Sequence, residues 1–206
     1  MIYVIACGDR PVCGAAKLAP RYGSLEPYWI DSRRLHHWRV PGGLYSWLQD
    51  KGSLTARIKS ACPAGAFRVR VRRQAWDKPL YSESRLLGVR RGTIAIIREV
   101  ELHCAGVPWV FARTLIPSSS LDGPARRLGR LGERPLGEVL FSDPRMRRGT
   151  MEVARLLPRH PLFWVAVNSL EQAPDMIWGR RTLFFLSGKP LLVNEIFLPD
   201  LPEDMP

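Results

Sequence analysis

Alternating apolar and polar side chains predict strands over residues 67–76, 93–104 and 190–198. In residues 67–76 apolar residues alternate with arginines, which is typical of a strand with one face in solvent. In the other two segments every second side chain is apolar, and side chains two apart share one face of a sheet. One charged residue interrupts each of these apolar stripes, Arg98 in the first and Glu195 in the second.

These two charges are costly where the pattern places them. Withdrawing an ion from water costs several kcal/mol unless another group compensates it. A cation and an anion on buried faces therefore indicate either structural ion pairs or a small, dry pocket for a polar ligand. The structural alternative pairs Arg98 and Glu195 with each other, or with neighbours such as Glu99, Glu101 and Arg181.

Turn residues join the strands into two hairpins. An Ala-Gly turn separates residues 93–104 from a returning strand over 108–117, in which Arg113 shares a face with bulky apolar residues. A second hairpin is predicted over residues 181–198, with its turn at 187–190. Tight turns of this kind predict antiparallel pairing of the strands that they join.

Helical patterns lie outside the hairpins. Apolar residues recur at helical spacing over 44–60, interrupted by a Gly-Ser pair in which Ser53 is a candidate N-cap for a second helix. Shorter helices are predicted over 121–131 and 135–141. Residues 142–178 contain four prolines and are expected to form a mixture of helix and loop. The whole pattern predicts an α+β fold, a single antiparallel sheet covered on one side by helices.

Composition bounds the class of protein. The chain has 206 residues, of which 46% are hydrophobic and 24% charged, as expected for one domain with a sizeable core. No apolar run approaches the ~20 residues that cross a bilayer, so we expect a cytoplasmic protein without stable membrane insertion. The four cysteines (Cys7, Cys13, Cys62 and Cys104) lack paired spacing, and we expect reduced thiols.

A net charge of +12 raises the hypothesis of nucleic-acid binding. The arginines are spread along the chain, however, and no motif of a nucleic-acid-binding module accompanies them. We therefore expect no nucleic-acid partner. A metal site is not expected either, because His36 and His37 are adjacent while His103 and His160 are distant in sequence.

Three strings of the sequence carry a resemblance to a known family. They are "REVELHCAGVPWVFARTLIP" (98–117), "LGERPLGEVLF" (131–141) and "WGRRTLFFLSGKPLLVNEIFLP" (178–199). In this order they resemble chorismate pyruvate-lyase, and "WLQDKGSLTARIK" (47–59) is similar to the helical segment near the N-terminus of that family. The resemblance runs from about residue 44 to residue 199.

The resemblance implies an antiparallel sheet with helical flaps over an internal ligand pocket. It divides the chain into an N-terminal extension, partly irregular, over residues 1–43, a lyase-like domain over 44–199 and a tail over 200–206. Residues 156–175 look like an insertion relative to the family. The implied activity is that of a carbon–oxygen lyase that converts chorismate to 4-hydroxybenzoate and pyruvate, the first committed step of ubiquinone biosynthesis. No metal or organic cofactor is implied.

Residue roles follow from the matching motifs. The resemblance implies that Arg98 holds the ring carboxylate and that Glu195 binds the 4-hydroxyl group, which would make both catalytic. Leu54 and Leu136 match positions that contact the bound ring acid, although the family typically has methionine at the position of Leu54. Strand parity and the resemblance make Arg113 a candidate for binding the enolpyruvyl carboxylate.

Other expectations accompany the enzyme hypothesis. Flaps that enclose the product imply slow release and product inhibition, and we expect a monomer. The alternative is a non-catalytic domain of the same fold that binds small acids, like the effector-binding domains of GntR-type transcription regulators. Such a domain normally follows a winged helix of about 65 residues, and residues 1–43 are too short to supply one.

Overall fold

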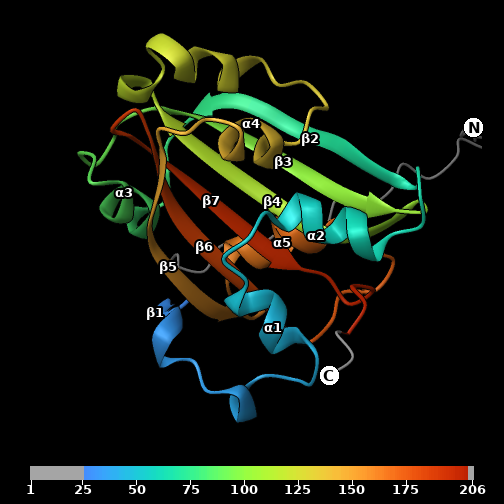
Figure 1. Ribbon diagram of the computed structural model, residues 1–206. Coiled ribbons are helices and arrows are strands. Elements are labelled where there is room, and N and C mark those ends of the chain that lie inside the picture. The colour runs from blue at the N-terminus through green and yellow to red at the C-terminus, as the bar shows by residue number, and fades with distance from the viewer. Residues whose placement is uncertain (1–25, 204–206) are drawn as a thin grey trace, which may run out of the picture.

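The computed structural model describes residues 26–203 (Figure 1). The predicted extension over residues 1–43 and the predicted tail over residues 200–206 therefore lie partly outside the described residues. The strands are β1 (Ile30–Asp31), β2 (Phe67–Asp77), β3 (Ala95–Cys104), β4 (Val107–Pro117), β5 (Met146–Leu156), β6 (Ile177–Leu186) and β7 (Lys189–Phe197). The α-helices are α1 (Leu44–Gln49), α2 (Leu54–Ala61), α3 (Tyr81–Leu87), α4 (Leu136–Phe141) and α5 (Pro161–Val167). Short 3₁₀ helices are η1 (Ser32–Arg34), η2 (His37–Arg39), η3 (Ser118–Ser120) and η4 (Gly123–Arg130).

All seven strands of the described chain form one sheet in the order β1-β5-β6-β7-β4-β3-β2. Every neighbouring pair is antiparallel, so the predicted α+β fold with a single antiparallel sheet is confirmed. The two predicted hairpins are β3–β4 and β6–β7, and β4 pairs with β7 to join them. The central strands β7 and β4 thus bring the two halves of the sequence together.

Two strands were not predicted, the two-residue β1 and the longer β5. Residues 146–156 were expected to be helix or loop, but they form β5 beside β6. Gly149 and three arginines interrupt the apolar alternation, and the register shifts between Arg148 and Met151. The expectation for this segment was therefore wrong, because an irregular strand carries little period-two signal.

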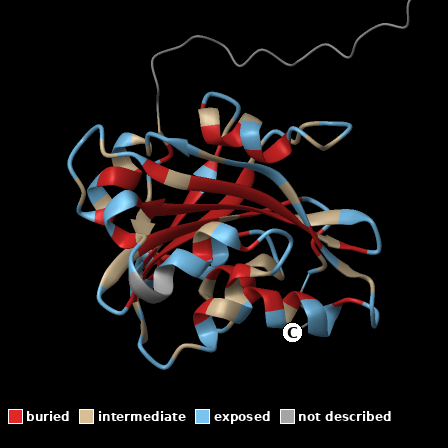
Figure 2. Ribbon diagram, turned by 90° about the horizontal axis from the view of Figure 1, so that it is seen from above, coloured by how far each residue is buried: buried red, intermediate tan, exposed pale blue. Residues whose placement is uncertain are grey.

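Helices cover both faces of the sheet rather than one (Figures 1 and 2). On one face, apolar side chains of α1, α2, η4 and α4 pack against the sheet. On the other face, α5 packs on Phe111 and Ile196, and α3 packs on Leu115 and Leu192. The central strands β3, β4, β6 and β7 are almost entirely buried, as Figure 2 shows.

Helices α2 and α4 approach each other closely above the first of these faces. The predicted N-cap of α2 is confirmed, because Ser53 accepts a hydrogen bond from the Ala56 amide at 3.3 Å. A Cβ atom on Gly137 would lie 2.9 Å from Thr55 Oγ1, so only glycine allows this approach. Lys59 and Glu138 form an ion pair of 2.6 Å between the same two helices.

A β-bulge fixes which side chains of β3 and β4 share a face. Cys104 pairs with Val107 across the turn, but the register shifts by one residue between Leu102 and His103. Beyond the shift, Arg98 lies opposite Thr114 and Glu99 lies opposite Arg113. Because a one-residue shift turns side chains to the other face, Arg98 and Arg113 point to opposite sides of the sheet.

A disulfide joins Cys62, at the C-terminal end of α2, to Cys104, at the end of β3. Their Cα atoms are 5.8 Å apart, which is an ordinary distance for a disulfide. The expectation of reduced thiols is therefore wrong for this pair, because two cysteines that are distant in sequence meet in the fold. Cys7 and Cys13 lie outside the described residues.

Reducing the Cys62–Cys104 bond is expected to destabilise the protein. The bond closes a loop with a sequence separation of 42 residues, for which chain entropy gives about 4 kcal/mol. Urea unfolding of oxidised protein, reduced protein and a Cys62→Ser variant measures the effect. Equal unfolding midpoints for the three samples would contradict it.

Candidate active site

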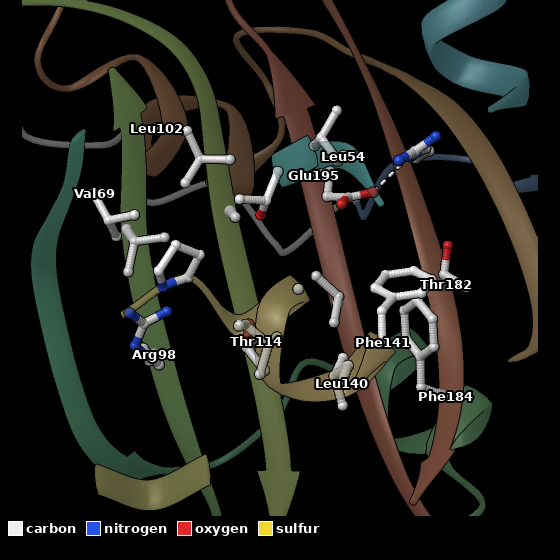
Figure 3. A pocket seen from close by; sticks show the side chains of 18 of the residues that line it. Leu54, Val69, Arg98, Leu102, Thr114, Leu140, Phe141, Thr182, Phe184 and Glu195 are labelled. Carbon is white, nitrogen blue, oxygen red and sulfur yellow. Dashed lines mark hydrogen bonds and ion pairs between the residues drawn. The ribbon is translucent and has the colours of Figure 1, made fainter. Parts of the chain in front are cut away.

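A cavity of about 50 Å³ lies between the sheet and helices α2 and α4 (Figure 3). A single water molecule needs about 10–15 Å³ on the same measure, so the space suits a small ring compound. Most of its wall is apolar, and the side chains with a formal charge are Arg98, Arg148, Arg180 and Glu195. Four charged groups around so small a volume must be paired or must await a ligand.

Arg98 is a buried cation without a carboxylate partner among residues 26–203. Its side chain projects from β3, and the residue is 1% exposed. Nη2 donates hydrogen bonds to the carbonyl oxygens of Gly132, at 2.8 Å, and Arg134, at 3.2 Å. Nε has no hydrogen-bond partner, and burial lowers the pKa of the guanidinium. An anion in the cavity would supply the missing charge and acceptor.

Glu195 projects from β7 into the same cavity. Its Oε2 accepts a hydrogen bond of 2.5 Å from Arg180 Nε, whereas Oε1 accepts none from the described residues. Arg180 is fixed in turn, because Nη1 donates to the carbonyl oxygens of Trp47, at 2.8 Å, and Asp50, at 2.6 Å. Arg180 therefore orients one carboxylate oxygen and leaves the other to face the cavity.

Arg98 and Glu195 do not pair with each other. Glu195 does form an ion pair, but with Arg180 rather than with Arg98. Arg98 pairs with neither Glu99 nor Glu101. Arg98 and Glu195 come from different strands and face the same space, as Figure 3 shows.

Leu54 and Leu136 also line the cavity, as expected for residues that contact a ring. Leu54 begins α2 and Leu136 begins α4. Both side chains are buried. The first turns of these two helices therefore form the roof of the cavity.

Arg113 does not join this group. On the opposite face of the sheet its Nε donates to Glu83 Oε1 at 3.1 Å, and its Nη1 donates to Glu99. Burial alone would lower the pKa of Arg113, but the two carboxylates outweigh burial and raise it. The expectation that Arg113 binds a substrate carboxylate is corrected by this placement, because the bulge in β3–β4 turns the side chain away from the cavity.

Sequence reasoning missed Arg180 and Arg148. Arg180 could have been found, because counting back from the two-residue turn of the β6–β7 hairpin places it opposite Glu195. Arg148 belongs to β5, which was not predicted, so no signal connected it with the pocket. Its Nη2 donates to the Gly52 carbonyl oxygen at 3.1 Å, and its guanidinium lies over the rings of Phe141 and Phe184.

Over residues 26–203, no three side chains of His, Cys, Asp or Glu cluster in a way that could hold a metal ion. Across the same residues, no helix has the length and apolar character to span a bilayer.

Comparison with known proteins identifies the family of this chain. The family model described as chorismate lyase matches residues 27–203. The chain belongs to the chorismate lyase family. A probable chorismate pyruvate-lyase of Methylococcus capsulatus is 46% identical over 155 residues, covering 75% of this chain and 93% of that protein. Another from Thiobacillus denitrificans is 40% identical over 181 residues, covering 88% and 94%. The predictions of this family and of a lyase enzyme are confirmed.

Solved structures share the fold at low sequence identity. PhnF from Mycobacterium smegmatis aligns with a TM-score of 0.53 at 16% identity, covering 74% of this chain and 66% of that chain. A GntR-family transcriptional regulator from Bacillus cereus aligns with a TM-score of 0.51 at 12% identity, covering 69% and 98%. At such identity the likeness establishes the fold alone.

The two buried arginines are expected to respond oppositely to replacement by methionine. Arg98→Met removes an uncompensated cation, so the ligand-free variant should be at least as stable as the native protein. Arg113→Met leaves Glu83 and Glu99 buried without their cation and should cost about 3–5 kcal/mol. Urea unfolding measures both, and an equal loss of stability in the two variants would contradict the assignment of Arg98 to a ligand.

Proposed function

We propose that this protein is a chorismate pyruvate-lyase that converts chorismate to 4-hydroxybenzoate and pyruvate and supplies ubiquinone biosynthesis. One observation carries the proposal. A buried arginine and a carboxylate with one oxygen unpaired line the same small, largely apolar cavity, and no carboxylate among residues 26–203 neutralises the arginine. Family membership and the names of the relatives support the same reaction.

Arg98 binds the ring carboxylate in this proposal. A guanidinium presents parallel N–H donors that match a carboxylate, and a charge-assisted contact is strong where water is excluded. Nε is without a partner in the buried side chain and supplies one of the donors. Leu54 and Leu136 close over the ring and keep water away from this contact.

Glu195 accepts a hydrogen bond from the C4 hydroxyl group of the substrate. Its Oε1 is the acceptor, because Oε2 is held by Arg180. As the C3–O ether bond breaks, the carboxylate stabilises the positive charge that develops on the ring. Loss of the C4 proton then makes the ring aromatic, and this gain makes the elimination downhill without an added reactant.

The experiment that tests the function separates an enzyme from a binding protein of the same fold. Purified protein is incubated with chorismate, and 4-hydroxybenzoate and pyruvate are measured. We expect the two products in equal amounts. Binding of chorismate without turnover would favour the alternative of a small-acid-binding domain like those of GntR-type regulators.

Glu195→Gln is expected to lower kcat by about 100-fold, because the amide is neutral while its shape is conserved. The midpoint of thermal unfolding should stay close to that of the native protein. Glu171→Gln, a change of the same kind on an exposed residue outside the cavity lining, is the matched control and should keep full activity. A variant of Glu195 with normal turnover would remove this residue from the site.

Product release is expected to limit the rate, because the family resemblance implies that α2 and α4 close as flaps over the bound product. Rapid-quench measurements should show a burst of 4-hydroxybenzoate followed by slower turnover, and added product should inhibit. A linear time course from the first turnover would contradict the prediction. The expectations of a cytoplasmic, monomeric enzyme stay predictions.

A further inference from the structure

We propose that Arg148 binds the second carboxylate of chorismate, the one on the enolpyruvyl arm. This inference rests on the proposed function and deepens it. Chorismate carries one carboxylate on its ring and one on the arm that becomes pyruvate. Binding such a dianion in a dry cavity requires two cations that are not already neutralised.

Of the three arginines that line the cavity, Arg180 is already neutralised. Its Nε holds Glu195, and its Nη1 holds two carbonyl oxygens at the end of α1. The Arg180–Glu195 pair therefore adds no net charge to the site. Arg98 and Arg148 remain, and among residues 26–203 neither lies within ion-pair distance of a carboxylate.

Two aromatic rings and one hydrogen bond orient Arg148, while most of its N–H groups have no acceptor among the described residues. Its guanidinium carbon lies 5.5 Å from the ring centre of Phe141 and 5.2 Å from that of Phe184. One of its five N–H groups donates to Gly52, and the described residues provide no acceptor for the others. Arg148 is half-buried; burial and the nearby charge of Arg180 lower the pKa of its guanidinium, and the charges of Glu195 and Asp50 partly offset this effect. No carboxylate among residues 26–203 forms an ion pair with it.

The order of the strands places Arg148 where the arm of the substrate should lie. Arg98 is on β3, Glu195 on β7 and Arg148 on β5, so the strand of Glu195 lies between the other two. In chorismate the arm is attached at C3, next to the hydroxyl-bearing C4 and away from the ring carboxylate. With the ring carboxylate on Arg98 and the hydroxyl on Glu195, one of the two orientations of the ring about the C1–C4 axis directs the arm to the side of β5, where Arg148 lies.

The position also suits the chemistry of the leaving group. When the C3–O bond breaks, its electron pair goes to the oxygen of the arm, and the C4 proton leaves the ring. The resulting enolpyruvate takes up a proton at its methylene carbon and becomes pyruvate, so no oxidant or reductant is needed. Arg148 holds the arm while negative charge grows on it, which favours the transition state over the bound substrate.

The product lacks the arm, and this difference makes the inference testable. A residue that contacts only the arm affects chorismate but not 4-hydroxybenzoate. A residue that merely supports the rings of Phe141 and Phe184 affects both ligands and the stability of the fold. Arg148→Met keeps the apolar stem and removes the charge, and Arg148→Lys keeps the charge but not the planar fork. Arg147→Met, at the neighbouring exposed position, is the matched control.

The experiment measures kcat/KM for chorismate, the Kd values of chorismate and 4-hydroxybenzoate by calorimetry, and the thermal midpoint of each variant. For Arg148→Met we expect kcat/KM to fall by about 100-fold, weaker chorismate binding, and a Kd for 4-hydroxybenzoate that stays within about twofold of native. The kcat/KM of Arg148→Lys for chorismate should lie between the values of the native protein and of Arg148→Met. Arg98→Met should lose affinity for both ligands, and Arg147→Met for neither.

Two results would overturn the role of Arg148. One is an unchanged kcat/KM and chorismate affinity in Arg148→Met, and the other is an equal loss of affinity for both ligands.

Failure of the proposed function gives different results. If the native protein binds chorismate without converting it, the lyase proposal fails, while a selective loss of chorismate affinity in Arg148→Met still supports the contact. If the native protein binds no chorismate, both proposals fail.

Discussion

The structure depends on a cation that residues 26–203 do not neutralise. Arg98 lies in the middle of an apolar sheet face, and two carbonyl oxygens hold one of its nitrogens, while no carboxylate of the described residues pairs with its charge. Such an arrangement lowers the stability of the ligand-free fold, because a buried charge without a counter-ion loses its solvation; in the function proposed above, an anionic ligand restores it. The apolar roof of α2 and α4 then keeps that recovered interaction strong.

The two faces of the sheet treat buried arginines in contrasting ways. On the face below α3, Arg113 is enclosed by Glu83 and Glu99 and ties the helix to the sheet. On the cavity face, Arg98 has no carboxylate partner among residues 26–203, and the Arg180–Glu195 pair leaves one carboxylate oxygen directed at the cavity. Buried charge therefore stabilises the fold on one face, and on the other it is left for the ligand that we propose.

Local patterns in the sequence predicted much of this architecture, and non-local geometry explains what they missed. Alternation and turn chemistry sufficed for both hairpins, and they placed Arg98 and Glu195 on the inner face. The turn alone, without a bulge, would set Arg113 directly opposite Arg98, and nothing in the local pattern reveals the shift that separates them. Because the alternation is interrupted around Gly149, neither β5 nor its cavity-lining Arg148 was predicted. Arg180 could have been predicted, because the second hairpin has a regular register that places it opposite Glu195.

The Cys62–Cys104 bond also constrains how the cavity can open. It fastens the last residues of α2 to the same strand that carries Arg98, so that end of the helix cannot lift away. The helix can only pivot about this anchor, with its Ser53 end as the moving tip. The contact of Gly137 with Thr55 lies at this end of α2, so the covalent bond holds the end of the helix that is farther from α4.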